Sequence, residues 1–520
     1  MLSDLRIFVI CSLFLLSGCA SLEIDDSRKP SYAFSNDEST QLARQLKTVT
    51  EKQSTNLSGF IVLDTGKEAL LKRLVVVTAA EKAIDLQYYI WNSDHSGRLL
   101  AQQLLLAADR GVHVRLLLDD FNIGDRDDVL NLFSAHPNIE LRVYNPIASR
   151  SGFGKILGLL GDFGRLNQRM HNKSIVVDAS VAIVGGRNIG DEYFDLHREM
   201  NFRDRDVIAV GNIVKDVSKS FDAYWNNDRA FSLTALDKAI PTEQEIDDFR
   251  TQLNQQVVGD QEYIEQAYET IRVLGGSIDE WKSNLVWADA ELIFDIPLSI
   301  DEQDGDQVKR VANKLADLAR QVEDELIIES AYLIPGDKGV ALLGKLGQKG
   351  VRVSALTNSL ASNDLTTNHS GYARRRQAML ENLVDLYELR PDAAVCQDLV
   401  ESIHKCDEDT LFGLHAKSMV FDRKIVFIGS FNVNQRSVFL NSETAMIIHS
   451  PEFAEQIATD IENSFNGENS WQLELTTDGE LEWLENTNSE VKRYRHEPKT
   501  GFWRRFTSGF YSLFPIEKYL

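Results

Sequence analysis

The feature that most constrains this chain is a nine-residue string that occurs twice. It reads MHNKSIVVD over residues 170–178 and LHAKSMVFD over residues 414–422. Both copies follow the pattern His-x-Lys-Ser, three apolar residues, then Asp, and the two histidines lie 244 residues apart. In each copy an asparagine follows the histidine by 17 positions, Asn188 in the first and Asn432 in the second. Because the string and its asparagine recur together, we interpret them as two copies of one structural unit.

Each copy has the apolar run of a buried strand, bounded by turn residues. Side chains alternate faces along a strand, so His171 and Lys173 point the same way. By the same alternation Asp178 is expected on the other face, where it would support the site and not touch a ligand. A turn near Ala179-Ser180 would send the chain back antiparallel and return Asn188 to the level of His171.

The second copy predicts the same arrangement. A turn through Arg423-Lys424 would bring Asn432 beside His415, with Lys417 on the same face and Asp422 on the other. Each half then presents an imidazole, an ammonium and a carboxamide at one strand end. That set suits a tetrahedral phosphate, because Lys and Asn can bind its oxygens while His attacks or transfers protons. A surface histidine beside a solvated lysine is the simpler interpretation of one copy alone, and the duplication disfavours it.

The repetition extends beyond the motif, because similar βαβ patterns precede both copies. In the first half the expected helices cover 70–83 and 97–110, and the strands 83–90 and 112–118. In the second half the helices cover 308–322 and 339–349, with strands at 326–333 and from 350 onward. We therefore expect an α/β fold of two similar domains related by a pseudo-twofold axis, with the motifs meeting at their interface.

An acid follows each asparagine on an apparent strand, Glu443 in the second half and Asp206 in the first. A carboxylate near an imidazole fixes its tautomer and stabilises its cation. In the first half seven extra residues intervene and Asp204 competes for this place. An exposed strand acid is an equally good interpretation of Asp206.

The doubled motif with its trailing asparagine resembles the phospholipase D superfamily. Further segments resemble its bacterial cardiolipin synthase branch, the C type in particular: DLQYYIW at 85–91, RGVHVRLLLDD at 110–120, RLNQRM at 165–170 and NHSGY at 368–372. The resemblance covers about residues 55–235 and 290–515. It implies two phospholipase D-like α/β/α sandwich domains with the active site at their interface.

The resemblance also implies a two-step transfer through a phosphohistidine. His171 is assigned as the nucleophile and His415 as the acid and base, although the near symmetry of the halves does not decide between them. The acids Glu443 and Asp206 would each orient the histidine of the opposite half. Lys173, Lys417, Asn188 and Asn432 would hold phosphoryl oxygens. No cofactor is implied, and the four cysteines and ten histidines show no metal-ligand spacing.

The implied reaction is cardiolipin synthesis from phosphatidylglycerol and a second phospholipid. Two alternatives stay open: hydrolysis of phospholipid headgroups by a phospholipase D or phosphodiesterase, and a non-catalytic lipid-binding protein. The net charge of −24 and pI near 4.9 disfavour nucleic acid as a partner. The sequence implies no obligate protein partner.

The N-terminus has Arg6, an apolar run over residues 7–16 and then LSGC at 16–19. The run is too short to span a bilayer and resembles a bacterial lipoprotein signal, with Cys19 as the lipidated mature N-terminus. We therefore expect an anchored protein in the bacterial cell envelope that faces the periplasm. The expected divisions are a signal at 1–18, a tether at 19–55, a first domain at 56–235, an acidic helical connector at 236–290, a second domain at 291–470 and a tail at 471–520.

Three further segments suggest local roles. The aromatic residues and arginines of the tail at 502–514 suit a membrane interface, and a C-terminal segment that docks on the core is the alternative. The three arginines of a loop at 368–376 could bind a second headgroup, although a solvated basic helix start fits them equally well. Cys396 and Cys406 could form a disulfide in an oxidising compartment, or could be two free thiols.

Overall fold

The computed structural model describes residues 25, 28–35, 39–123, 126–147, 163–236, 239–267, 278, 282–300, 302, 308–402, 410–487 and 490–520. The predicted signal segment with Cys19 lies outside the described residues, and so does Cys406. Within the described ranges, no helix combines the length and apolar character needed to cross a bilayer.

The first half builds a mixed sheet with the strand order β9-β4-β3-β2-β5-β6-β8-β1. The neighbours β2, β3 and β4 run parallel, and every other pairing is antiparallel. The strands are β1 (Ser58–Leu63), β2 (Ala83–Tyr88), β3 (His113–Asp119), β4 (Ile139–Tyr144), β5 (Ser174–Val177), β6 (Val181–Gly185), β8 (Asp206–Gly211) and β9 (Ala230–Ser232).

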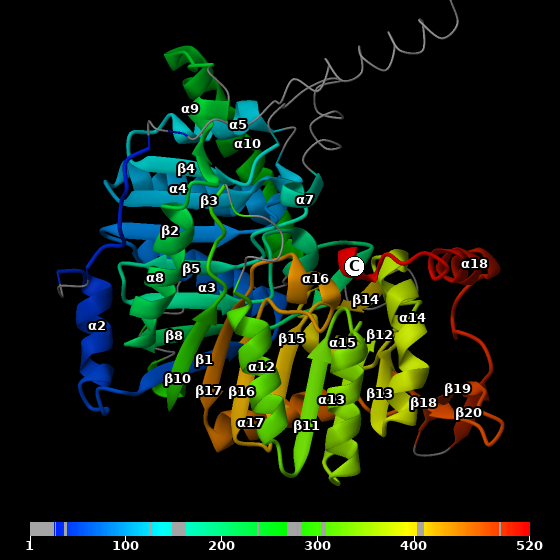
Figure 1. The fold of residues 1–520 in the computed structure, drawn as a ribbon. Helices are drawn as coiled ribbons and strands as arrows, with labels where there is room; N and C mark the ends of the chain where they lie inside the picture. The colour runs from blue at the N-terminus through cyan, green and yellow to red at the C-terminus, as the bar shows by residue number, and fades with distance from the viewer. Residues whose placement is uncertain are drawn as a thin grey trace, which may run out of the picture.

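The second half repeats this order as β18-β13-β12-β11-β15-β16-β17-β10, and a β-hairpin extends the edge at β18. The strands are β10 (Val286–Phe294), β11 (Glu325–Ser330), β12 (Arg352–Asn358), β13 (Val384–Leu389), β15 (Lys417–Phe421), β16 (Ile425–Gly429), β17 (Thr444–His449), β18 (Ser470–Leu475), β19 (Leu481–Asn486) and β20 (Val491–Tyr494). Antiparallel pairing of Ser58–Phe60 in β1 with Val286–Ala288 in β10 joins the halves into one 18-stranded sheet. The predicted duplicated α/β fold is confirmed (Figure 1).

Helices cover both faces of each half. The remaining strands and the helices of the first half are β7 (Met200–Arg203), α2 (Gln41–Thr50), α3 (Gly66–Ala79), α4 (His95–Asp109), α5 (Asp127–Ser134), α7 (Phe163–Leu166), α8 (Ile213–Trp225) and α9 (Leu233–Leu236). The second half has β14 (Leu411–Leu414), α12 (Arg310–Gln321), α13 (Asp337–Gln348), α14 (Thr366–Glu381), α15 (Cys396–Leu399), α16 (Gln435–Phe439), α17 (Pro451–Glu462) and α18 (Phe502–Tyr511).

One hydrophobic core is shared between the halves. It combines Val214 of α8 and Ile457 of α17 with strand residues from both repeats, among them Val184 and Val426. The outer faces have cores of their own, under α3 and α4 in the first half and under α12 and α13 in the second. Because the central core binds the two repeats to each other, the ends of the motif strands are held in a fixed relation.

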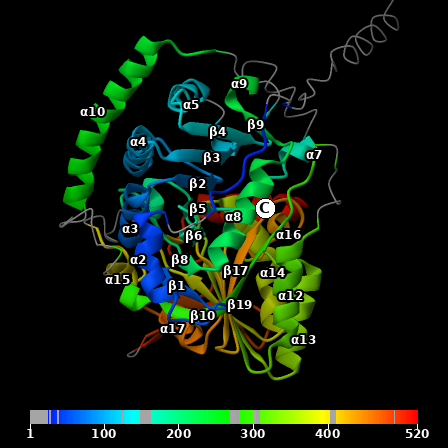
Figure 2. The same cartoon turned by 90° about the vertical axis from the view of Figure 1, so that its left-hand side faces the viewer.

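The connector contributes one long helix, α10 (Glu243–Ala267), which lies along α4 and α5 (Figure 2). Polar contacts attach it to α4, since Arg98 forms two 2.7 Å hydrogen bonds with Asp260. The segment expected as a loop at 368–376 is part of helix α14, so that expectation is wrong. Helix α18 in turn lies against α14 (Figure 1).

Candidate active site

Each motif histidine is hydrogen-bonded to the other half through its backbone. The His171 amide donates to the Ser442 carbonyl over 3.0 Å, and the Ser442 amide donates to the Arg169 carbonyl over 2.8 Å. In the same way the His415 amide donates to the carbonyl of Arg203 over 2.8 Å, at the end of the parallel pair β7–β14. These backbone contacts between the repeats bring both motifs to one interface.

Each histidine is paired with a carboxylate from the opposite repeat. The Nδ1 atom of His171 lies 2.9 Å from Oε2 of Glu443, and Nδ1 of His415 lies 2.5 Å from Oδ2 of Asp204. All four residues are buried. Because a carboxylate accepts the hydrogen bond, Nδ1 carries the proton in each ring and Nε2 is left with its lone pair.

The expectation that Asp206 orients a histidine is wrong. Asp206 instead accepts hydrogen bonds from Arg73 over 2.8 Å and from the backbone amide of Arg187 over 3.2 Å. It begins strand β8, where it pairs with Gly185 inside the first repeat, whereas Asp204 precedes the strand and reaches across the interface. The sequence held one signal for Asp204, because Gly186 stands where the second copy has Ser430. A Cβ atom at position 186 would lie 2.2 Å from Oδ1 of Asp204.

The two carboxylates are supported differently. Glu443 accepts hydrogen bonds from the hydroxyls of Ser430 and Ser437, the latter over 2.7 Å. Asp204 accepts one from the Arg205 amide over 2.7 Å. Burial alone would raise the pKa of Glu443, but the contact with His171, the charge of Lys173 and the hydrogen bond from Ser430 outweigh it and hold that pKa below its usual value. The contacts with His415 and Lys417 likewise hold the pKa of Asp204 below its usual value, against burial, so both groups are carboxylates at neutral pH.

Burial keeps both imidazoles neutral. It lowers the pKa of His171 to about 4, although the charge of Glu443 opposes the shift. The pKa of His415 falls to about 3, first through burial and then through the charge of Lys417, against the opposing charge of Asp204. The unprotonated Nε2 of either ring can therefore act as a nucleophile near neutral pH.

The motif lysines lie beside their own histidines. Nζ of Lys173 donates to the His171 carbonyl over 2.6 Å and stands 5.4 Å from the ring centre of Tyr89. Nζ of Lys417 contacts the His415 carbonyl and lies 2.9 Å from its Nδ1. Burial lowers the pKa of Lys173 to about 7, against the charge of Glu443, and that of Lys417 to about 8, against the charge of Asp204. Each ammonium keeps further N–H groups for a phosphate.

The asparagines differ between the copies. The Asn188 carboxamide accepts from the Ile90 amide over 3.2 Å and donates to the Tyr193 hydroxyl over 2.9 Å. The side-chain oxygen of Asn432 is buried and has no hydrogen-bond partner among the described residues. Sequence reasoning missed the two tyrosines of the site walls. The rings of Tyr89 and Tyr193 each lie 5.0 Å, centre to centre, from those of His171 and His415 respectively.

The motif aspartates lie at the far ends of their strands. Asp178 accepts from the amides of Glu81, Lys82 and Ala83, the last over 2.9 Å. Asp422 does the same for three amides at the start of β11, those of Glu323, Asp324 and Glu325. Asp178 and Asp422 also sit in the turns of their hairpins, with φ values of 49° and 50°. They fix the strand that carries each histidine and do not face the phosphate site.

The arginines of α14 are already paired, so they are not free for a second headgroup. Arg374 lies 3.4 Å from Glu517, Arg375 lies 2.5 Å from both Glu517 and Asp337, and Arg376 lies 2.7 Å from Glu497. Cys396 is disulfide-bonded, and its predicted bond to Cys406 stays a prediction because Cys406 is outside the described residues. The described residues hold no group of three or more His, Cys, Asp or Glu side chains suited to a metal ion.

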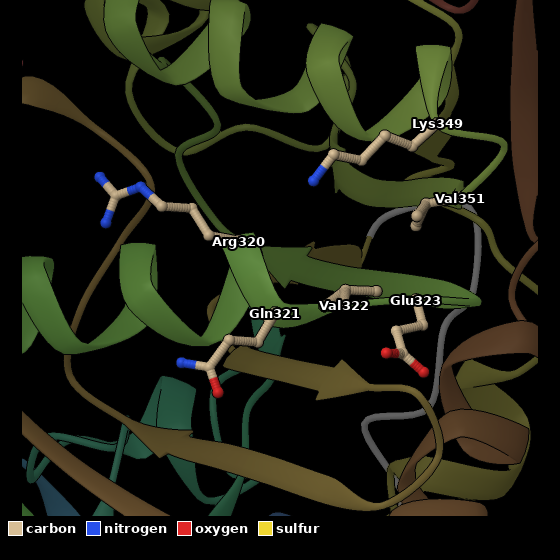
Figure 3. A pocket seen from close by; sticks show the side chains of 6 residues that line it. All are labelled: Arg320, Gln321, Val322, Glu323, Lys349 and Val351. Carbon is tan, nitrogen blue, oxygen red and sulfur yellow. The ribbon is translucent and has the colours of Figure 1, made fainter.

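A hollow of about 540 Å³ lies at the opposite end of β11 and β12 from the histidines (Figure 3). Its lining includes Arg320, Glu323 and Lys349, and no motif residue borders it. Glu323 is also one of the residues whose amide binds Asp422. The hollow therefore belongs to the structural end of the strands, not to the histidine site.

A duplicated α/β fold with two crossed histidine–carboxylate pairs defines the phospholipase D-like class of phosphoryl-transferring proteins. The family model described as "Cardiolipin synthase, PLD-like domain" matches this chain twice, at residues 75–225 and 315–465. The chain therefore belongs to the family of phospholipase D-like cardiolipin synthases.

The relatives agree with this assignment. Cardiolipin synthase C of Escherichia coli K12 is 38% identical over 88% of this chain and 95% of its own length. An uncharacterized protein of Helicobacter pylori J99 is 29% identical over 98% of this chain and 99% of its own. The crystal structure of phosphatidylserine synthase from Haemophilus influenzae Rd KW20 shares the fold, with a TM-score of 0.55 at 13% identity over 92% of this chain and all of that one.

Proposed function

We propose that this protein makes cardiolipin by moving a phosphatidyl group from one phospholipid to the hydroxyl of another. The observation that carries the proposal is the pair of buried histidines, each held by a carboxylate of the opposite repeat at 2.9 and 2.5 Å. Phosphatidylglycerol is the natural substrate class, because cardiolipin contains a glycerol between two phosphatidyl groups. The 38% identity to cardiolipin synthase C supports this choice.

In the first step Nε2 of His171 attacks the phosphorus, and the bond from phosphorus to the headgroup oxygen breaks. His415 gives the leaving oxygen a proton from its Nε2, so the headgroup departs as a neutral alcohol. The free imidazole of His415 is neutral, so it must be protonated before this step. The negative charge of the bound phosphodiester favours that imidazolium, and the Asp204 carboxylate stabilises it.

In the second step the incoming lipid hydroxyl gives its proton to Nε2 of His415 and attacks the phosphorus. The bond between phosphorus and Nε2 of His171 breaks, which frees the enzyme. Lys173, Lys417 and the two asparagines would bind the non-bridging oxygens and offset the charge that develops in each transition state. Asp178 and Asp422 have no part in these steps.

The test is to incubate the purified protein with phosphatidylglycerol vesicles, with and without phosphatidylethanolamine, and to read the products by mass spectrometry. Cardiolipin as the main product supports the synthase, whereas phosphatidic acid as the main product under every lipid mixture would replace it with a phospholipase. Trapping lipid-derived phosphate on the protein excludes a purely lipid-binding role. The exposed His449→Ala variant is a control that should keep wild-type activity.

We further propose that the protein is a lipoprotein of the bacterial cell envelope that faces the periplasm. The LSGC string at residues 16–19 supports this, and a membrane anchor suits an enzyme whose substrates are lipids. The Cys19→Ala variant should remain unprocessed and carry no acyl chains. Mass spectrometry of the mature N-terminus checks it, and a mature protein that begins at an unmodified residue other than Cys19 would refute it.

A further inference from the structure

Helix α18 presents an unusually apolar face to solvent. Trp503 is 73% exposed, Leu513 76% and Phe502 65%. The exposed side chains of this face, which we call the aromatic face, are Phe502, Trp503, Phe506, Phe510, Leu513 and Phe514. Within the helix they recur at intervals of one, three and four residues, which places them on one side. Several of their rings contact each other, with Phe502 and Phe506 stacked at 6.1 Å.

The opposite side of α18 is fixed to the second repeat. Arg504 donates to the Asn363 carbonyl over 2.6 Å, and Arg374 of α14 donates to the Phe514 carbonyl over 3.1 Å. Ser508 lies on the same side of the helix as Arg504 and is buried, whereas the contact to Phe514 holds the backbone that follows the helix. The aromatic face is therefore held outward by a rigid attachment, so its exposure is part of the fold.

A basic hollow lies beside the aromatic face. The turn between β20 and α18 borders a shallow, open depression of about 560 Å³, and its basic and histidine side chains are those of Arg493, Arg495, His496, Lys499 and Arg505. Arg505 belongs to α18 itself, and its guanidinium donates to the Thr500 carbonyl over 2.8 Å.

Acids near the basic hollow neutralise it only in part. Glu482 lies 3.1 Å from Arg493 and 3.6 Å from Arg495, and Asp392 contacts Lys499. Glu497 also lines the hollow, but its carboxylate is paired with Arg376 over 2.7 Å and with His369 over 3.2 Å. Glu474 lies 3.7 Å from Arg493. Four basic side chains, those of Arg493, Arg495, Lys499 and Arg505, thus stand against three acids that are available to them, and this excess of positive charge favours an anion.

The segment that contains helix α18 has a net charge opposite to that of the whole protein. Residues 498–516 contain Lys499, Arg504 and Arg505 and no acid, although the chain has a net charge of −24. A second copy of so acidic a protein would be repelled, whereas an anionic bilayer is attracted to a basic segment without acids. Aromatic rings with flanking arginines are also the composition that settles at headgroup depth.

We propose that the aromatic face and the basic hollow form one docking surface for a bilayer that contains anionic phospholipid. The rings enter the interface, and the hollow receives one phosphate headgroup. This lipid is bound for attachment and does not react, because no motif residue lines the hollow. The surface is distinct from the phosphohistidine site, and its occupancy does not depend on turnover.

The attachment of α18 links the docking surface to the wall of the active site. Asn363, which accepts from Arg504, is followed by Asp364, whose carboxylate accepts from the Tyr332 hydroxyl over 2.9 Å. Burial lowers the pKa of Lys417, and the charge of Asp364 is among those that oppose this shift, so this carboxylate acts on the active site electrostatically. A bilayer held at α18 would therefore lie on the side of the second repeat that borders the site.

The first test detects contact between Trp503 and the bilayer, so attachment through another part of the chain does not decide its result. The full chain is mixed with vesicles whose acyl chains carry bromine, of phosphatidylcholine alone or with phosphatidylglycerol, and tryptophan emission is recorded. We expect quenching that increases with phosphatidylglycerol and is largely lost in Trp503→Phe. The matched control Trp287→Phe, on strand β10, should keep it. If brominated vesicles quench the same fraction of the emission in Trp503→Phe as in the wild type, the proposal is wrong.

The second test separates the headgroup from the apolar contact. The double variant Arg495→Glu with Lys499→Glu should lose the phosphatidylglycerol dependence and keep the weaker quenching by phosphatidylcholine. The control pair Arg320→Glu and Lys349→Glu changes the same charge in the hollow of Figure 3, which has a similar volume, and should behave like the wild type. Equal loss in both double variants would mean general charge attraction and would overturn the headgroup site.

Different experiments test the docking surface and the proposed reaction. The His171→Ala variant should show full quenching without product, so loss of catalysis leaves the docking result intact. If Trp503→Ala instead abolishes a concentration-dependent dimer in the absence of vesicles, the aromatic face binds a second copy, and the bilayer proposal is wrong.

Discussion

The two repeats form the same histidine–carboxylate pair from different side chains. In the first, His171 faces a glutamate that two serine hydroxyls hold; in the second, His415 faces the shorter Asp204, held by a backbone amide. Nζ of Lys417 also lies 2.9 Å from the His415 ring nitrogen, and no such contact to the ring is formed by Lys173 among the described contacts. Burial and this ammonium keep His415 the more firmly neutral of the pair, with a pKa of about 3 against about 4 for His171. The copies are equivalent in backbone and unequal in electrostatics, so their roles can differ.

Removing either imidazole should have the largest effect. His171→Ala and His415→Ala should each slow cardiolipin formation by about 10³-fold or more, because nucleophilic and acid–base catalysis are both lost. Circular dichroism should show an intact fold. A substrate with a good leaving group sharpens the comparison, since it needs no acid in the first step. His415→Ala should then still form the phosphohistidine, whereas His171→Ala should not. The reverse result would exchange the two roles.

Replacing the lysines should separate activity from stability. Lys173→Met and Lys417→Met should each lose about 10²-fold in rate, through the missing phosphate contact. Both should melt at a higher temperature, because a buried ammonium with a pKa lowered to about 7 or 8 costs folding free energy at neutral pH. The rise in melting temperature should be larger for Lys173→Met, because the pKa of Lys173 is lower than that of Lys417. Calorimetry and initial rates check both effects, and a lower melting temperature in either variant would contradict this account.

Asp204 and Asp206 lie two residues apart, and their asparagine variants should differ in activity and stability. Asp204→Asn should reduce activity about tenfold or more with little loss of stability, because His415 loses the charge that stabilises its cation. Asp206→Asn should instead destabilise the protein by about 3 kcal/mol, since Arg73 and Arg187 lose a buried partner. Urea unfolding and initial rates distinguish the two. Equal stability losses would mean that Asp204 is also structural.

The pH dependence of stability should report the buried imidazoles. Their pKa values in the folded protein are about 4 and about 3, below the 6.5 of an exposed histidine. Between pH 6.5 and 4 the unfolded chain therefore binds more protons, so the free energy of unfolding should fall as the pH is lowered through this range. The His171→Asn/His415→Asn double variant should show a shallower fall. An unchanged slope would mean that the histidines are not the groups that titrate.

The smallest effect is expected at the motif aspartates. Asp178→Asn and Asp422→Asn should each reduce stability by about 1–2 kcal/mol, by weakening the bonds to three backbone amides. Their activity should stay within a fewfold of the wild type, as neither carboxylate faces the phosphate site. The two losses should be similar, because the amide contacts are the same in both repeats. A rate loss comparable to that of the lysine variants would place the aspartates in the reaction.

Local patterns predicted the local structure well. The alternation around His171 and His415 placed the hairpins and the backward-facing aspartates, because strand periodicity and turn position lie within a short stretch of sequence. The expected helix at 70–83 occurs at Gly66–Ala79, where Thr65 caps its start by accepting from the Glu68 amide. Threonine is a common N-cap, so this boundary could have been predicted.

Features set by contacts between distant segments could not be predicted in the same way. The choice of Asp204 over Asp206 depends on which residue precedes strand β8 and crosses to the other repeat. Arg374 and Arg375 looked free in the sequence because their partner Glu517 lies about 140 positions away. Tyr193 likewise reaches His415 only through the interface. Sequence neighbours do not reveal such pairs.

The crossed pairs have an evolutionary consequence. Since each repeat supplies the carboxylate that the other repeat's histidine needs, one repeat alone could never hold an oriented imidazole. A single-copy ancestor could have built this site only as a symmetric dimer, with every substitution appearing in both histidine sites at once. Fusion into one chain removed that restriction. Position 430 can then hold a serine while position 186 holds a glycine, and the two imidazoles can take on separate tasks.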